Sequence, residues 1–247
     1  VGFSMGGIGY VGVGYADSIS IFLEGFWQYS RAADTATVAV PIPVCNSWVQ
    51  EPNFGGSARP YAAGFSIGHY GFMGGGGSNI AMHDFWQWNQ RTNQWTSIAN
   101  YPGSGSVCLA ACSVNGKGYV GLGTIPGGSV SYKDFWSYDT INGWTQLANF
   151  PGTARYSSFC FGIGHNIYIG CGDPGSHPYL SDVWEYNTVT NTWTQKNNFP
   201  GGSDGGMIGF AIGKNGYAGG GNITTMWQYD TTNDSWTSIA SIPSPGN

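Results

Sequence analysis

The chain has 247 residues, of which 13 are acidic and 8 are basic, giving a formal net charge of −5. No cluster of Lys and Arg occurs, so the sequence lacks the basic patch typical of nucleic-acid binding. No run of 18 apolar residues is present, so we expect no membrane insertion. Only 9% of residues are charged, so the surface must be covered largely by Asn, Gln, Ser, Thr and Gly.

Two kinds of tryptophan-containing segment recur five times along the chain. One kind is an aromatic cluster, and the other is a tryptophan usually followed by Thr. In chain order the two sets are Trp27, Trp86, Trp136, Trp184 and Trp227, and Trp48, Trp95, Trp144, Trp193 and Trp236. A repeat of roughly 40 to 50 residues predicts a propeller, solenoid or array.

Each unit also contains a Gly-aromatic step between two short apolar runs. The step is at Gly9-Tyr10, Gly71-Phe72, Gly118-Tyr119 and Gly216-Tyr217, with Ile167-Tyr168 as the exception. The two runs, the aromatic cluster and the Trp-Thr segment then predict four strands, which we call A to D in chain order. Short strands separated by Gly-rich turns are typical of an all-β protein.

Strand A has a distinct column of residues on each face, because successive side chains of a strand alternate. One column is bulky in four of the five units, and the other is small. The columns are Phe3, Phe65, Cys112, Phe161 and Phe210, and Gly2, Gly64, Ala111, Cys160 and Gly209. This pattern suits sheets that converge on a crowded axis.

The repeat closely resembles the kelch repeat of β-propellers. The best matches are 92–96 (TNQWT) and 190–194 (TNTWT), which are followed by Tyr-Pro-Gly at 101–103 and Phe-Pro-Gly at 199–201. The resemblance implies one domain, 1–247, folded as an all-β propeller of five four-stranded blades. The blades would be about 1–56, 57–104, 105–153, 154–203 and 204–247. Because kelch propellers usually have six or seven blades, the chain could instead be part of a larger one.

The expected binding surface is the face that carries the D–A and B–C connections. The B–C loops differ most between units, and variable loops on a rigid scaffold commonly bind ligands. The candidate ligand-binding residues on this face are Arg59, Tyr61, His83, Tyr132, Arg155, Tyr156, His177, Tyr179 and Asp204. For Arg59 and Arg155 the alternative is structural, with each guanidinium hydrogen-bonded to backbone carbonyls of an interblade turn.

We predict a non-catalytic module that binds a protein or glycan and needs no cofactor or metal. The sequence contains no Gly-x-Ser-x-Gly or phosphate-binding Gly-x-x-x-x-Gly-Lys motif. The alternative is a carbohydrate-active or copper-radical oxidase-like propeller enzyme. A copper oxidase of this kind would need two His, two Tyr and a Cys joined to a Tyr, and we find no such set.

Low charge and abundant Asn, Gln, Gly and Thr resemble secreted bacterial kelch arrays, so we expect an extracellular or cell-surface protein. Short motifs suggest glycosylation. The candidate acceptors are Ser18, Thr35, Thr140, Thr231, Asn222 and Asn233.

The five cysteines are an odd number, which leaves at least one thiol unpaired within a monomer. Cys108 and Cys112 are expected on one strand, four residues apart, where their separation is too great for them to bridge each other.

One insertion stands out between strands C and D of the first unit. Residues 31–44 end in an apolar stretch with Pro41 and Pro43, which excludes a helix or a central strand there. We expect this segment to fold over the rim of its blade or to contact a partner.

Overall fold

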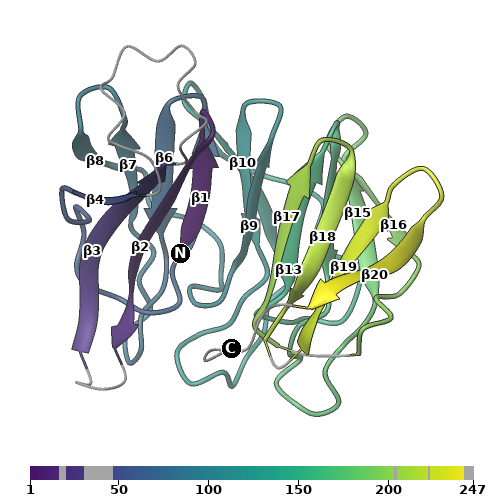
Figure 1. Ribbon diagram of the computed structural model, residues 1–247. Helices are drawn as coiled ribbons and strands as arrows, with labels where there is room; N and C mark the ends of the chain where they lie inside the picture. The colour runs from purple at the N-terminus through teal and green to yellow at the C-terminus, as the bar shows by residue number, and fades with distance from the viewer. Residues whose placement is uncertain (17–20, 31–46, 203–204, 222, 242–247) are drawn as a thin grey trace.

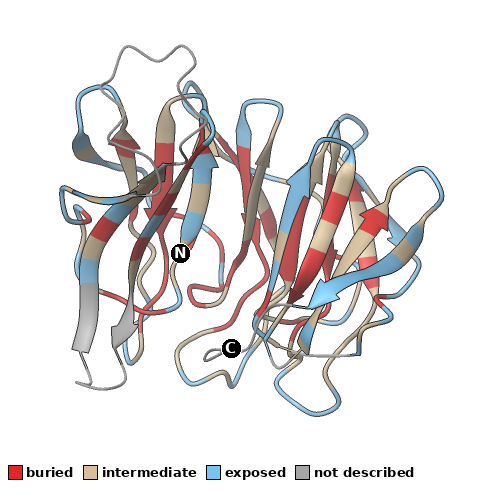
Figure 2. Cartoon of the chain, viewed as in Figure 1, coloured by how far each residue is buried: buried red, intermediate tan, exposed pale blue. Residues whose placement is uncertain are grey.

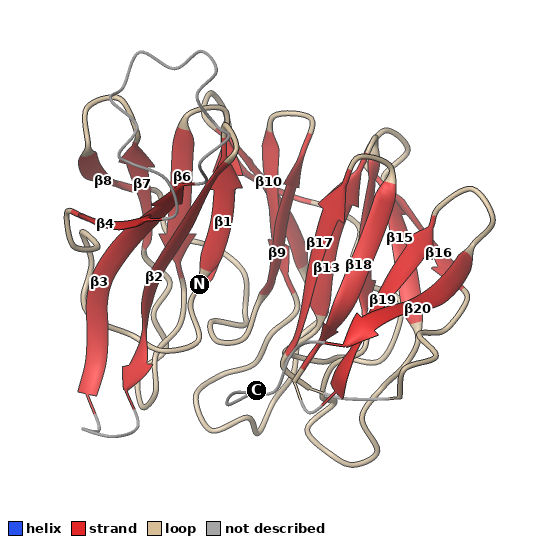
Figure 3. Cartoon of the chain, in the orientation of Figure 1, coloured by secondary structure: helices blue, strands red, loops and turns tan. Residues whose placement is uncertain are grey.

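The computed structural model describes residues 1–16, 21–30, 47–202, 205–221 and 223–241. Within these residues every regular element is a strand, and none is a helix (Figures 1 and 3). The strands form five four-stranded antiparallel sheets. The chain is therefore an all-β, five-bladed β-propeller, which confirms the predicted fold class.

The blades follow one another along the chain, and each is built from four consecutive strands. Blade 1 contains β1 (Gly2–Met5), β2 (Ile8–Ala16), β3 (Ile21–Ser30) and β4 (Ser47–Glu51). Blade 2 contains β5 (Ala63–Ile67), β6 (Tyr70–Gly74), β7 (Phe85–Asn89) and β8 (Gln94–Ile98). Blade 3 contains β9 (Ala110–Val114), β10 (Lys117–Gly121), β11 (Phe135–Asp139) and β12 (Gly143–Gln146). Blade 4 contains β13 (Phe159–Ile163), β14 (Asn166–Gly170), β15 (Val183–Asn187) and β16 (Thr192–Lys196). Blade 5 contains β17 (Met207–Ile212), β18 (Asn215–Gly220), β19 (Ile223–Asp230) and β20 (Ser235–Ser241).

Each strand pairs with the next one in the chain, so strand A is one edge of every blade and strand D is the other. The A strands of consecutive blades contact one another, from β1 to β5, β9, β13 and β17. These strands therefore lie at the centre of the propeller, and strands such as β8 and β16 lie at its rim (Figure 1).

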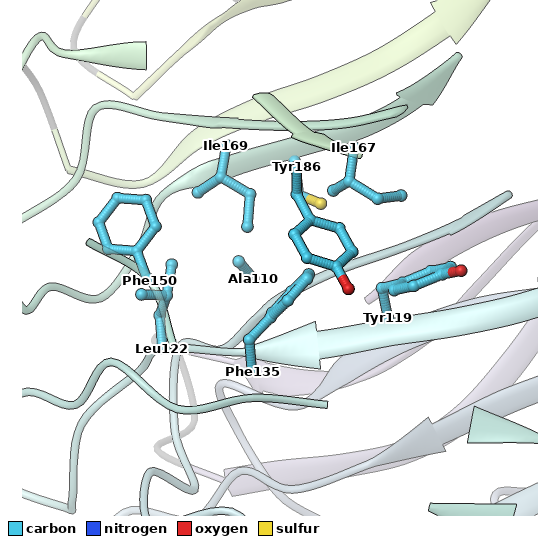
Figure 4. Close-up of a cluster of buried hydrophobic side chains, with 9 residues drawn as sticks. Ala110, Tyr119, Leu122, Phe135, Phe150, Ile167, Ile169 and Tyr186 are labelled. Atoms are coloured by element: carbon cyan, nitrogen blue, oxygen red, sulfur yellow. The ribbon is translucent and has the colours of Figure 1, made fainter. Parts of the chain in front are cut away.

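The hydrophobic core lies between blades. The buried residues form four clusters, and each cluster combines side chains from two consecutive blades. Figure 4 shows the cluster between blades 3 and 4, where Phe135 of β11 faces Tyr186 of β15 at a centroid distance of 5.2 Å. Figure 2 shows buried stretches on strands such as β10 and β18, and exposed turns at the ends of the blades. Blade-on-blade packing thus replaces a single central core.

Strand A and strand B fit together across three junctions by a large-to-small match. The rings of Phe3, Phe65 and Phe161 lie over Gly71, Gly118 and Gly216 of the following blade. A Cβ atom at any of these glycines would overlap the ring. The Gly of the Gly-aromatic step is therefore required by close packing between blades.

The tryptophans of the D strands tie each blade to the loop before it. The indole N–H donates to a backbone carbonyl of that loop in four blades. The pairs are Trp95 to Pro52 (3.2 Å), Trp144 to Ala99 (2.9 Å), Trp193 to Ala148 (2.9 Å) and Trp236 to Asn197 (3.3 Å). The strand-D tryptophan therefore recurs in the sequence because its indole forms a hydrogen bond at each of the four junctions between blades 1 and 5.

The junction between blades 5 and 1 differs from the other four. Within the described strands, no Cα atom of blade 5 lies within 8 Å of one in blade 1. Phe210 is 41% exposed, whereas its counterpart Phe161 is 1% exposed. Trp48 is likewise 56% exposed. Blades 5 and 1 therefore leave exposed the Phe210 ring, whose counterparts Phe65 and Phe161 are buried at their own junctions.

The prediction that Cys108 and Cys112 lie on one strand is wrong. Cys108 lies before β9 with φ of +54°, so it does not share a strand with Cys112. The insertion 31–44 lies outside the described residues, so its expected contact stays a prediction.

Candidate ligand-binding face

The D–A connections approach the propeller axis through three residues that occupy equivalent places in their blades. Tyr61, Cys108 and Ser157 each lie two positions before the first residue of strand A and have φ of +58°, +54° and +55°. This left-handed conformation is disfavoured for residues other than Gly, Asn and Asp. Strained positions of this kind cluster at functional sites.

Backbone hydrogen bonds join these three residues to one another around the axis. The N–H of Cys108 donates to the carbonyl of Tyr61 at 3.1 Å, and the N–H of Ser157 donates to that of Cys108 at 3.0 Å. Gly206 continues the series to Ser157 at 3.2 Å. The left-handed conformation thus lets each D–A connection form a backbone hydrogen bond with the next one. These bonds connect blades 2 to 5 on this face.

A cleft of about 330 Å³ opens beside these turns. It is built from D–A and B–C connections of blades 2, 3 and 4. Its lining residues are all uncharged: Tyr61, Gly77, Ser78, Val107, Cys108, Thr124, Pro126, Gly127, Gly128, Tyr156 and Ser157. Such a cleft is suited to a neutral ligand with both apolar and hydroxyl groups.

Two tyrosines contribute to the cleft. Tyr61 is 61% exposed, so its ring is available for contact with a ligand. The Tyr156 hydroxyl donates to Asp173 Oδ2 at 2.7 Å. Burial, together with this carboxylate, raises the pKa of Tyr156 to about 12. Tyr156 is therefore a neutral phenol held in place at physiological pH.

Cys108 is the one thiol among the cleft's lining residues. Burial raises its pKa, and a hydrogen bond with Ser157 offsets only part of that effect. The nucleophilic form of a cysteine is the thiolate, which a raised pKa disfavours near neutral pH. Cys108 therefore has the character of a packing and contact residue. Sequence reasoning missed its place here, although its alignment with Tyr61 and Ser157 before strand A could have revealed it.

Arg155 lies beneath this face, and its side chain is 0% exposed. Its guanidinium forms two hydrogen bonds with Asp182, at 2.7 and 2.8 Å. It also donates to the carbonyls of Thr153 (2.8 Å) and Cys171 (3.1 Å) and lies over the ring of Phe150. All of these contacts are structural.

Arg59 repeats this arrangement in blade 2, where its side chain is 2% exposed. It pairs with Asp84 at 2.6 and 2.8 Å and donates to the carbonyls of Ser57 and Gly75. Its guanidinium lies over Phe54 at 5.1 Å. Both arginines are buried, and a ligand-contacting role for Arg59 and Arg155 stays a prediction. Both bind backbone carbonyls and a carboxylate, as the structural alternative expected.

Blade 3 keeps the carboxylate of this cluster but has Ser106 where blades 2 and 4 have Arg. Asp134 Oδ2 instead accepts from the backbone N–H of Ser104 (2.8 Å) and from Trp136 Nε1 (3.0 Å). Gly105 comes so close to the Leu122 carbonyl that a Cβ atom would overlap it. The glycine-rich turn thus packs where an Arg side chain lies in blades 2 and 4.

The other predicted residues are distributed over the same face and do not line the cleft. The His83 ring is stacked on Tyr101 with centroids 6.5 Å apart. The exposed His177 ring meets Tyr179 edge-on at 4.8 Å. Tyr132 is half-buried and donates its backbone N–H to Gly123. Asp204 lies outside the described residues. Of the nine candidates, the cleft brings together only Tyr61 and Tyr156.

Three of the candidate glycosylation residues lie in described turns between strands C and D. Thr140 and Asn233 are exposed and Thr231 is half-buried. Ser18, Thr35 and Asn222 lie outside the described residues. Their modification remains a prediction.

Across the described part of the chain, no group of three or more His, Cys, Asp or Glu side chains is arranged to hold a metal ion. In the same part, no helix is long and apolar enough to cross a membrane.

The five four-stranded sheets define a β-propeller, and the cleft formed by its loops marks a candidate binding face. The family described as "Kelch motif" matches residues 163–200, which run from the end of β13 to the loop after β16. Together, this match and the five-bladed architecture support a kelch-repeat β-propeller.

Solved structures also resemble the fold. One, titled "Structure of YjhT", has a TM-score of 0.77 and 15% sequence identity. The similarity covers 98% of this chain and 83% of that one. At this identity the likeness concerns the fold alone. No curated protein matches the sequence.

Proposed function

We propose that the chain is a non-catalytic binding module whose cleft on the D–A/B–C face takes a neutral glycan. The observation that carries this proposal is the cleft itself, which is uncharged along its lining and flanked by Tyr61 and Tyr156. A kelch-type propeller is compatible with a binding or scaffolding role, and the ligand is the specific part of the proposal.

The chemistry of the lining favours a sugar over a charged ligand. Tyrosine rings offer an apolar face against which the C–H groups of a sugar ring can pack, together with a polar hydroxyl at one end. Ser157 and the backbone groups of Gly127 and Gly128 supply hydrogen-bonding partners for sugar hydroxyls. A volume of about 330 Å³ lies in the usual range for small-molecule sites.

We further propose that the protein acts outside the cell or at its surface, where glycans are abundant. The low charged fraction of 9% and the exposed Thr140 and Asn233 support this location. Mass spectrometry of the protein isolated from its own source tests it, with glycosylated peptides at 140 or 233 as the expected result. Recovery of unmodified protein solely from the cytosolic fraction would contradict it.

A glycan array probed with the purified chain tests the binding proposal. We expect a restricted set of neutral glycans, with binding reduced at least tenfold in Tyr61→Ala. Ile141→Ala is the control, because Ile141 is 90% exposed in the β11–β12 turn, away from the cleft. Equal binding by both variants would reject the cleft. Binding to a protein ligand, with no glycan bound, would reject the ligand class.

A further inference from the structure

The junction between blades 3 and 4 departs from the packing rule of its neighbours. Three junctions place a strand-A phenylalanine, Phe3, Phe65 or Phe161, against small residues of the next blade. The residues under the rings are Gly71, Gly118 and Gly216 of the Gly-aromatic step. The small strand-A residues of the same blades are Gly64, Ala111 and Gly209. At the exceptional junction the phenylalanine is replaced by Cys112, and the small residues are replaced by Cys160 and Ile167.

These substitutions compensate one another in volume. Cys112 is much smaller than Phe, and the space is filled by the side chains of Cys160 and Ile167 from the opposite blade. Both belong to the same core cluster, and Cys112 packs against it. As a result, two cysteines face each other across the junction at the positions where a ring and a glycine meet elsewhere.

The two sulfur atoms are 2.6 Å apart. This separation is well below the sum of two sulfur van der Waals radii and lies within about 0.6 Å of a covalent S–S bond. Cys112 belongs to β9 and Cys160 to β13, and these strands are neighbours at the propeller axis.

We propose that Cys112 and Cys160 form a disulfide that joins blades 3 and 4 when the protein meets a disulfide oxidant. In the reaction the two thiols lose two protons and two electrons, and one Sγ–Sγ bond forms. Oxidised glutathione is a sufficient oxidant, since its own disulfide accepts the electrons and protons and leaves as two thiols.

The propeller axis gives the oxidant a route to this pair. A cavity of about 260 Å³ between the five A strands is lined by both cysteines. Cys112 is half-buried, whereas Cys160 is 7% exposed. Burial and the neighbouring Cys112 raise the pKa of Cys160, which disfavours its thiolate. Cys112 therefore reacts first with the oxidant, and Cys160 then displaces glutathione from the mixed disulfide.

The test is disulfide mapping of the intact chain. The native protein is incubated with oxidised glutathione, remaining thiols are blocked with iodoacetamide, and the digest is read by mass spectrometry. We expect a linked peptide pair containing Cys112 and Cys160, which dithiothreitol abolishes. Full alkylation of both cysteines after oxidation, or a link from either to another cysteine, would overturn the proposal.

Thermal unfolding provides a second, independent readout. The bridge closes a loop between positions 48 residues apart, so it should restrict the unfolded chain. We expect the oxidised protein to melt about 5–15 °C above the reduced protein. Cys112→Ser should abolish this difference, and Cys108→Ser, the matched control in the cleft, should retain it. An unchanged difference in a folded Cys112→Ser variant would count against the bridge.

Discussion

Two parallel hydrogen bonds join the guanidinium of Arg155 to the carboxylate of Asp182, at 2.7 and 2.8 Å. The arginine lies in the D–A connection that leads into blade 4, and the aspartate lies at the end of the B–C loop of that blade. The pair therefore acts as a clamp that holds these two connections together. Arg59 and Asp84 form the same clamp in blade 2. This recurrence gives the buried arginines a structural role that can be measured.

Arg155→Ala is expected to lower the free energy of unfolding by about 3 kcal/mol, because it leaves a partly buried carboxylate and two carbonyls without their donor. Urea denaturation measures the loss. Lys117→Ala is the control, since the Lys117 side chain is 47% exposed and its ammonium lies 3.4 Å from Asp139. It should cost less than about 1 kcal/mol. Equal effects of the two variants would show that the Arg155 pair is not a clamp.

Stability should decrease in acid because of the same carboxylates. Burial by itself would raise the pKa of Asp182 and of Asp84, but hydrogen bonds from the paired Arg and Trp residues and the arginine charge outweigh it, so both pKa values are lowered. A backbone hydrogen bond from Asn142, followed by other contacts, lowers the pKa of Asp139 to about 2.

A carboxyl whose folded pKa is below its unfolded value, about 3.9, stabilises the protein fully above that value. The contribution is lost as pH falls through the folded pKa. We therefore expect the urea midpoint to fall between pH 5.5 and pH 2.5. The fall should be smaller in Asp182→Asn, each protein being compared with itself at pH 5.5. An identical fall in both proteins would exclude this carboxyl as a source of the acid sensitivity.

The uncovered junction between blades 5 and 1 predicts unequal roles for equivalent phenylalanines. Phe161→Ala should cost about 3–5 kcal/mol, because the ring is buried against Gly216 of blade 5. Phe210→Ala should cost about 1 kcal/mol or less, because Phe210 is 41% exposed. Chemical denaturation of the two variants makes the comparison. Similar losses would mean that blades 5 and 1 are packed together in solution.

A substitution at Tyr61 can remove ligand binding with little effect on stability, because Tyr61 has φ of +58°. Tyr61→Gly removes the steric cost of this conformation while adding chain entropy to the unfolded state. We expect a free energy of unfolding within about 1 kcal/mol of the original, together with loss of glycan binding. Calorimetry and a binding assay on the same sample test this. Retained binding would show that the Tyr61 ring is not a contact residue.

Much of the fold could be predicted from the sequence because its signals are local and repeated. Alternation along each strand places Phe65 and Gly64 on opposite faces, and the Gly-aromatic steps and paired tryptophans mark four strands in every unit. The number of strands per blade and their order along the chain follow from these patterns. The sequence predicted the face on which the cleft lies and its two tyrosines, Tyr61 and Tyr156. It did not predict the other residues that line the cleft.

The tertiary structure alone decided which side chains meet. Arg155 and Tyr156 are adjacent in sequence, yet the first is sealed under the loops and the second lines the cleft, because a partner 27 residues away captures the guanidinium. Cys112 and Cys160 occupy different columns of the repeat and come together only when blade 4 packs on blade 3. Local patterns determine each blade, whereas contacts, burial and chemistry between blades depend on the packing of segments far apart in the chain.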